Sequence, residues 1–331
     1  MSWAAALPVI FMALMGLSML AYVVLDGYDL GVGLLLHRAS DPQKDTMIAS
    51  IGPFWDANET WLVLGVGLLL IAFPKAHGMV LGALYMPVAF MLIGLILRGV
   101  AFDFRVKAQA SHQAAWNRAF ALGSAIASMA QGWMLGRYIT GFAEGWQFSA
   151  FAAVIALLLP ASYVLLGSGW LIMKTEGGLQ QHAVAWAKTA WPPLVLGMAL
   201  ISLATPLVSP TVRGKWFSLP DFFALLPIPL MTVAALLGAR AVLNSRQVLG
   251  RLCWLPFALV VLVFLLGACG LAYSLFPYVV MDRLTLWQAA SATESLAAIG
   301  VGCAVTVPVI VGYTVFSYRV FWGKAGELQY A

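Results

Sequence analysis

The chain has 331 residues, of which 62% are apolar and only 9% are charged, and its mean hydropathy is +0.92. A soluble globular domain carries about 25% charged residues, so this composition excludes a soluble protein and predicts an integral membrane protein. The net charge of +5 does not indicate nucleic-acid binding, because the basic residues are scattered through short loops and form no cluster with aromatic residues.

Nine apolar segments are long enough to cross a bilayer, which requires about 20 mostly apolar residues. No connection between them could hold a soluble domain, so we expect residues 1–331 to form a single polytopic membrane domain. The expected fold is all-α, and we favour two four-helix bundles plus one peripheral helix, although no internal repeat marks two halves. The predicted spans lie at about 7–36, 51–74, 78–101, 119–142, 149–173, 187–209, 221–243, 252–276 and 297–320.

The distribution of Lys and Arg predicts the orientation in the membrane. Twelve of these residues fall on one side of the nine-span threading and four on the other, and cytoplasmic loops are the ones enriched in Lys and Arg. The N-terminus is therefore expected outside and the C-terminus in the cytoplasm. The twelve are Arg38, Lys44, Arg105, Lys107, Arg118, Lys174, Lys188, Arg240, Arg246, Arg251, Arg319 and Lys324.

Two acidic pairs lie within or beside the first two spans: Asp26 with Asp29, and Asp56 with Glu59. A carboxylate within hydrocarbon costs several kcal/mol, so it usually persists where it moves protons or ions, or where it pairs with a cation. The members of each pair are three residues apart, which places them on one helix face about one turn from each other. Both pairs are predicted near the cytoplasmic side and could form one cluster.

Three neighbours extend this predicted cluster. Arg98 of the third span reaches a similar depth, and it either anchors a helix end at the interface or pairs with one of the acids, which we favour. Asn58, with Trp55 and Trp61, continues the polar face of the second acidic pair. A structural interpretation remains open, because acids near a helix start are stabilised by the helix dipole and need no further role.

A series of motifs resembles subunit II of cytochrome bd-type quinol oxidases over essentially the whole chain, with details that favour the cyanide-insensitive branch. The motifs are DGYDLGVG (residues 26–33), GPFWDANETWLV (52–63), the Phe73-Pro74 turn, GALYMPVAF (82–90), LILRGVAFDFR (95–105), SLFPYVV (274–280), LTLWQAAS (284–291) and VPVIVGYTVFSYRVF (307–321).

This resemblance implies one subunit of a heterodimer that oxidises quinol and reduces oxygen to water in the bacterial cytoplasmic (inner) membrane. The haems b and haem d are expected in the partner, subunit I, and none is expected to be ligated by this chain. That agrees with its four histidines, His37, His77, His112 and His182, which all fall outside the predicted spans. A structural quinone or phospholipid and a small single-span subunit are further expected components.

The resemblance also implies roles for particular residues. Asp26, Asp29 and Asp56 match acids of a cytoplasm-facing path that delivers protons toward the haems. Trp61 matches a tryptophan near an oxygen access route, and Trp55 lies beside a region that contacts a quinone or lipid. The chain departs from the best-known members at Glu59, which makes its place in the relay less secure than that of Asp56, and also at Phe54, Ala57 and Thr60.

Two other functions stay open at this point. A proton-coupled transporter would also contain intramembrane acids, but such folds usually show paired halves with equivalent interrupted helices, whereas the acids here are confined to the first two spans. A purely structural subunit without a proton role would differ from the first hypothesis only in the kinetics of its variants.

Overall fold

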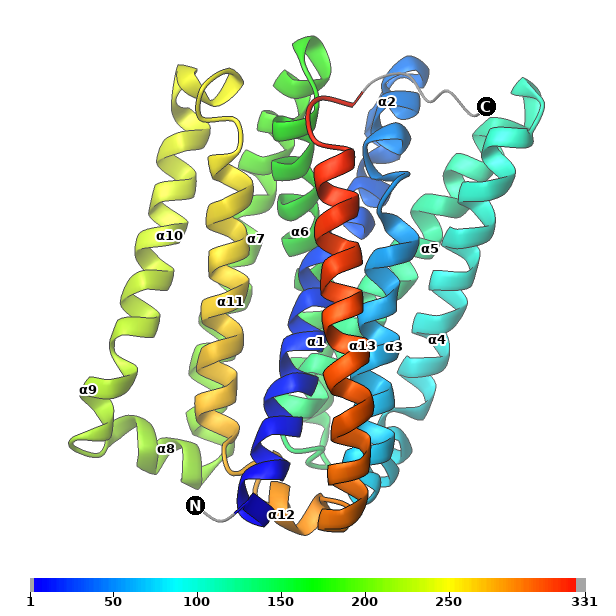
Figure 1. Ribbon diagram of the computed structural model, residues 1–331. Coiled ribbons are helices and arrows are strands. Elements are labelled where there is room, and N and C mark those ends of the chain that lie inside the picture. Colours follow the sequence, from blue (N-terminus) through cyan, green and yellow to red (C-terminus); the bar gives the residue numbers. More distant parts are fainter. Residues whose placement is uncertain (1–2, 326–331) are drawn as a thin grey trace.

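The computed structural model describes residues 3–325 and shows a bundle of long helices running side by side (Figure 1). Each predicted span overlaps one of these helices. The long helices are α1 (Trp3–Leu35), α3 (Trp55–Ala72), α4 (Pro74–Lys107), α5 (Ala110–Ile139), α6 (Trp146–Lys174), α7 (Gly177–Val208), α10 (Pro227–Asn244), α11 (Leu255–Leu275) and α13 (Thr293–Val320).

Eight helices in the described part of the chain are long and apolar enough to cross a membrane. The helix that does not meet this criterion is α5, which has 30 residues and therefore extends about 45 Å. Its composition is more polar because several of its side chains, including Ser124, Ser128 and Gln131, face the protein interior. Since α5 lies between α4 and α6, these polar groups are shielded by neighbouring helices.

The helices pack as one continuous bundle in which two groups can be distinguished. In the first, α1, α3, α4 and α5 pack together, and in the second, α6 packs against α7 and α11 while α10 packs against α7 and α11. The two groups meet where α1 and α5 both pack against α6. Helix α13 packs against α1 and α3 at the periphery, and most of its surface is exposed.

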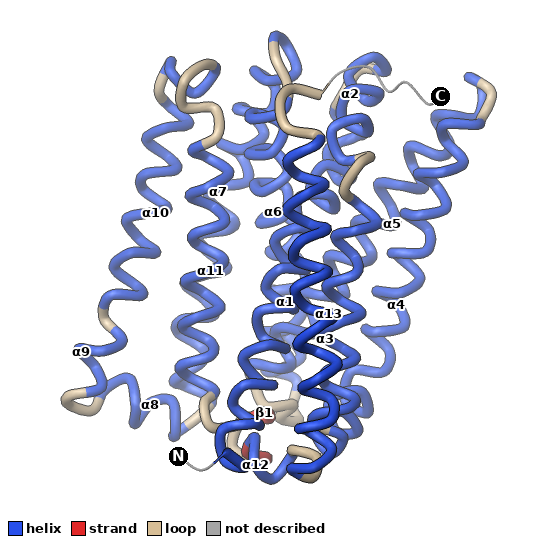
Figure 2. The backbone as a smooth tube through the Cα atoms, in the orientation of Figure 1, coloured by secondary structure: helices blue, strands red, loops and turns tan. Residues whose placement is uncertain are grey.

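Several short elements were not predicted, and they gather at the two ends of the bundle (Figure 2). Helix α2 lies at the same end as the last turns of α13, whereas α8, α9 and α12 lie at the opposite end with the start of α1 (Figure 1). These elements are η1 (Leu36–Arg38), α2 (Asp41–Ile51), α8 (Pro210–Phe217), α9 (Asp221–Leu225), η2 (Arg246–Leu249), α12 (Leu286–Ala289) and the antiparallel strands β1 (Tyr278–Val280) and β2 (Leu284–Thr285).

Helix α2 changes the predicted start of the second span. It begins after Ser40, whose side chain forms a capping box with Gln43, and it ends at Ile51. Helix α3 then begins at Trp55, so the second span starts four residues later than predicted, after a turn at residues 52–54. Arg105 of α4 fixes α2 in place, because its Nη2 atom donates to Asp45 Oδ1 at 2.5 Å.

Two glycine contacts bring the helices around the acidic residues unusually close. A Cβ atom at Gly31 of α1 would lie 1.8 Å from the backbone oxygen of Tyr163 on α6. A Cβ atom at Gly123 of α5 would lie 2.8 Å from the backbone nitrogen of Arg98 on α4. Small residues of this kind let membrane helices approach at backbone distance, and here they set the positions of α1, α4, α5 and α6 around the acids.

Candidate functional site

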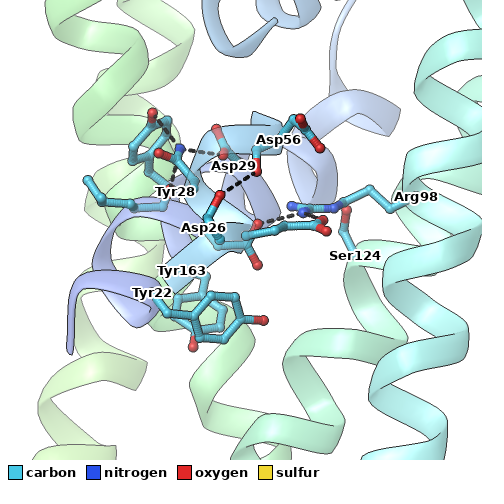
Figure 3. A network of polar contacts seen from close by, with 12 residues as sticks. Tyr22, Asp26, Tyr28, Asp29, Asp56, Arg98, Ser124 and Tyr163 are labelled. Carbon is cyan, nitrogen blue, oxygen red and sulfur yellow. Dashed lines mark hydrogen bonds and ion pairs between the residues drawn. The ribbon is translucent and has the colours of Figure 1, made fainter. Parts of the chain in front are cut away.

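Arg98 is the cation at the centre of the site. Its Nη2 atom lies 2.5 Å from Asp26 Oδ1 and also donates a hydrogen bond to Glu59 Oε1 (Figure 3). The Asp26 side chain is completely buried and that of Arg98 is 1% exposed, while Glu59 keeps 28% of its side chain exposed. Helices α1, α3 and α4 thus each contribute one charged group, and of the two interpretations of Arg98 the structure shows the pairing.

Asp29 lies one turn further along α1 and has different partners. Its Oδ2 atom accepts a hydrogen bond of 2.8 Å from Asn58 Nδ2, which also donates to the Tyr28 hydroxyl at 3.0 Å. The Tyr28 hydroxyl lies 2.6 Å from that of Tyr318 on α13, and Tyr318 donates to Asn58 Oδ1 at 3.2 Å. A closed ring of neutral polar groups therefore holds Asp29, and within residues 3–325 no cation forms an ion pair with it.

A second set of neutral groups lies on the other side of Asp26. Tyr163 of α6 donates to Gln131 Oε1 at 2.5 Å, and Gln131 Nε2 donates to the Tyr22 hydroxyl at 2.8 Å. Tyr22 and Tyr163 lie together beneath Asp26 in Figure 3. All three side chains are at least nine-tenths buried.

The charges of the site do not balance when every group is ionised. Asp26, Asp29 and Glu59 supply three carboxyl groups, and Arg98 is the cation in contact with two of them. Fully ionised, they would leave two excess negative charges at low dielectric, where like charges repel strongly. Each proton bound reduces this repulsion, so the cluster is suited to take up and release protons.

The two acids of α3, Asp56 and Glu59, differ in their surroundings. Glu59 contacts Arg98, whereas Asp56 lies in the first turn of α3 and its side chain is exposed. The helix dipole stabilises a negative charge at this position, as the structural interpretation expected. Glu59 is therefore the α3 acid that belongs to the buried cluster, and Asp56 lies beside it toward the surface.

Neither tryptophan singled out from the sequence contacts the charged groups. The Trp55 ring packs against Phe102 with 5.0 Å between ring centroids, and it lies over Gly99 of α4. Trp61 is 9% exposed and belongs to the apolar core. The structure therefore describes their packing and leaves their proposed contacts with oxygen, quinone or lipid as predictions.

Sequence reasoning missed five members of the site: Tyr22, Tyr28, Gln131, Tyr163 and Tyr318. Tyrosines are common at both interfaces of membrane helices, so their presence carried little signal. Gln131 offered a better one, because an uncharged polar side chain in the middle of a long helix must find a hydrogen-bond partner away from water. In the described residues no group of three or more His, Cys, Asp or Glu is placed to hold a metal ion.

A family model for cytochrome bd terminal oxidase subunit II matches residues 7–321. The chain belongs to this family. "Cytochrome bd ubiquinol oxidase subunit 2" of Bacillus subtilis is 24% identical over 96% of both chains. "Cytochrome bd-I ubiquinol oxidase subunit 2" of Escherichia coli K12 is 25% identical, over 95% of this chain and 94% of that one.

The fold agrees with this membership of the subunit II family. The solved bd oxidase of Geobacillus thermodenitrificans contains a chain that superposes with a TM-score of 0.79 at 16% identity, covering 96% of this chain and 99% of the other. At this identity the similarity shows a shared fold. The chain is thus a multi-pass membrane subunit of a bd-type oxidase, as its motifs predicted.

Proposed function

We propose that this subunit supports the haem-bearing subunit I of a quinol:oxygen oxidoreductase and delivers protons from the cytoplasm toward the partner's haems. The observation that carries the proton role is the buried cluster in which Asp26 and Glu59 contact Arg98 and Asp29 lies one helical turn from Asp26. Reduction of oxygen to water consumes protons, and intramembrane carboxyl groups with a charge excess are suited to supply them.

The exposure of the acids gives the path a direction. Asp56 is exposed, Glu59 is partly exposed, and Asp26 and Asp29 are fully buried. A proton would enter at Asp56, pass to Glu59 beside Arg98, and reach the buried pair Asp26 and Asp29. Arg98 holds the Glu59 and Asp26 carboxylates near one another and compensates the charge that remains when a proton moves on.

The orientation we propose places Asp56 on the cytoplasmic side of the bacterial inner membrane. The start of α3 lies at the same end of the bundle as α2 and the last turns of α13 (Figure 1). This end carries the larger set of Lys and Arg residues, which favours the cytoplasm. The N-terminal end of α1 would then lie in the periplasm.

The haems b and haem d belong to the partner in this proposal, together with the quinol and oxygen chemistry. A structural quinone or phospholipid beside Trp55 and a small single-span subunit remain parts of the proposal that rest on the family resemblance. The chain itself we take to be one membrane domain. A proton-coupled transporter, the alternative that the acids also allowed, finds no support in the comparisons.

The test replaces the buried acids in the assembled oxidase with Asp26→Asn and Asp29→Asn. Each variant should keep its haem content and lose at least about tenfold in turnover, which corresponds to a barrier raised by roughly 1.4 kcal/mol. Asp103→Asn is the matched control, because Asp103 is an exposed acid near the end of α4. Turnover per haem that is unchanged in both buried variants would refute the proton role and leave a purely structural subunit.

A further inference from the structure

The hydrogen-bond chain formed by Tyr163, Gln131 and Tyr22 is not used by the proton path. It connects α6 to α5 and α5 to α1 where the two helix groups meet. Gln131 is 8% exposed, Tyr22 2% and Tyr163 1%, so water competes little for these groups. The direction in which these three groups donate their hydrogen bonds determines whether Tyr22 has a hydrogen left to donate to Asp26.

The placement of the Gln131 amide oxygen and nitrogen gives these hydrogen bonds their direction. Each tyrosine hydroxyl has one hydrogen to donate, and the amide of Gln131 has one acceptor oxygen and one donor nitrogen. Tyr163 gives its hydrogen to Gln131 Oε1, and Gln131 Nε2 in turn donates to the Tyr22 hydroxyl. The Tyr22 oxygen thus accepts from Gln131, and its own hydrogen remains for a different acceptor.

The acceptor that the fold provides is Asp26. Tyr22 precedes Asp26 by four residues on α1, which puts both side chains on one helix face. Both carboxyl oxygens of Asp26 are buried and, apart from the ion pair with Arg98, have no hydrogen-bond donor among the described residues. Gly27 contributes by leaving room for Tyr163, since a Cβ atom there would lie 2.8 Å from the Tyr163 ring. Both tyrosines therefore lie against the residue that pairs with Arg98.

We propose that Gln131 and Tyr163 are positioning residues that direct the Tyr22 hydroxyl hydrogen toward Asp26 and so set how readily Asp26 takes up a proton. A hydrogen bond to a carboxylate favours its charged form, and a donor that is itself hydrogen-bonded donates more strongly. The effect on the protonation of Asp26 can be measured without turnover, whereas its use in proton delivery rests on the proposed function above.

Other groups also act on Asp26, and the test must hold them constant. Asp29 approaches it from α1, Glu59 from α3, Arg98 from α4, and Tyr163 from α6. From α5 the contribution is Gln131, which is neutral at every pH of interest. A change at Gln131 therefore alters the hydrogen-bond chain without adding or removing a charge near Asp26.

The experiment follows the carbonyl stretch of protonated carboxyl groups by infrared spectroscopy while the purified oxidase complex is titrated. The band of Asp26 is the one that Asp26→Asn removes and Asp26→Glu displaces in frequency. A hydrogen bond to a charged group contributes about 1.5–3 kcal/mol. Tyr22→Phe should therefore move the titration of this band upward by about 1 pH unit, and Gln131→Leu and Tyr163→Phe should move it in the same direction by a smaller amount.

Matched controls make the same chemical changes elsewhere. Tyr138→Phe removes a buried hydroxyl that donates to the Val279 backbone, and Gln180→Leu removes a buried amide that donates to the Ile172 backbone. Both should leave the Asp26 band at its wild-type titration. A merely structural role for Gln131 would lower thermal stability as the controls do, without moving the band.

The outcomes separate this inference from the proposed function. If Gln131→Leu and Tyr163→Phe leave the Asp26 band unmoved, the positioning role is refuted even where Asp26→Asn abolishes turnover. If the band moves while Asp26→Asn keeps full turnover, the positioning role holds and the proton path fails.

Discussion

Arg98 and Asp26 form an ion pair in which both side chains are buried, with 2.5 Å between Nη2 and Oδ1. The same guanidinium contacts Glu59, so α4 is joined through one side chain to both α1 and α3. A buried pair adds little net stability when intact, but removing one partner leaves an uncompensated charge that costs several kcal/mol. The stability of the helix group around Arg98 should therefore depend on the charges of its partners.

Arg98→Met tests this dependence. We expect a loss of about 3–5 kcal/mol in the free energy of unfolding, measured as a lower midpoint of thermal unfolding and a lower yield of assembled oxidase. Adding Asp26→Asn and Glu59→Gln to the same chain should recover most of the loss, because the two former partners of Arg98 then carry no charge that it would have to compensate. Arg319→Met, at an exposed position on α13, is the control; equal stability of the Arg98 and Arg319 variants would contradict the expectation.

Glu59→Gln should reduce oxidase turnover more than Asp56→Asn. Glu59 contacts Arg98 inside the cluster, whereas water can replace the exposed carboxyl group of Asp56 as a proton donor. Turnover per haem, compared at one pH and ionic strength, measures the difference. A more severe defect in Asp56→Asn would show that the surface acid, rather than the buried one, limits proton entry.

Gly31→Ala should destabilise the subunit by several kcal/mol. The added Cβ atom would lie 1.8 Å from the Tyr163 backbone oxygen, so α1 and α6 must separate and their close packing is lost. Gly16→Ala is a control on the same helix, because nothing lies within 4 Å of a Cβ atom there. Its stability should be equal or higher, by up to about 1 kcal/mol. Thermal unfolding of both variants decides the matter, and equal midpoints would show that the helix contact is not limiting.

Tyr318→Phe should loosen the last turns of α13. The substitution keeps the ring stacked on Phe54, at 4.5 Å between centroids, but removes the hydroxyl that joins Tyr28 and Asn58. We expect a loss of about 1 kcal/mol and faster hydrogen exchange in residues 314–320. Tyr313→Phe is the comparison, because Tyr313 is 58% exposed on the same helix. If both variants exchange alike, the hydroxyl is not what holds α13.

The acidic residues and Arg98 could be placed together from the sequence, because their energetic cost in hydrocarbon is large and their spacing fits one helix face. Their neutral partners could not. Gln131 meets Tyr163 and Tyr22 only through the rotation and separation of α1, α5 and α6, which depend on contacts between residues distant in the chain.

For a related reason, the sequence could not show which of Asp56 and Glu59 contacts Arg98. Both acids lie in the first turns of α3 and share one helix face, so the way α3 packs against α4 decides which one reaches Arg98. The capped helix α2 ends at Ile51 and shifts the beginning of α3 to Trp55. Helix α5 shows a different limit of the sequence. Its interior polar side chains weaken the apolar signal of a segment that still runs the length of the bundle.

Tyr163 contributes its backbone oxygen to the contact with Gly31 and its hydroxyl to the bond with Gln131. Substitutions that move α1 away from α6 therefore also displace Tyr163, which is one end of the hydrogen-bond chain that leads through Gln131 and Tyr22 toward Asp26. Substitutions at the α1–α6 contact are therefore constrained by the protonation of Asp26 as well as by helix packing. Suppressors selected for restored respiration in a Gly31→Ala strain should accordingly fall at residues that draw the two helices back together, rather than at the acids themselves.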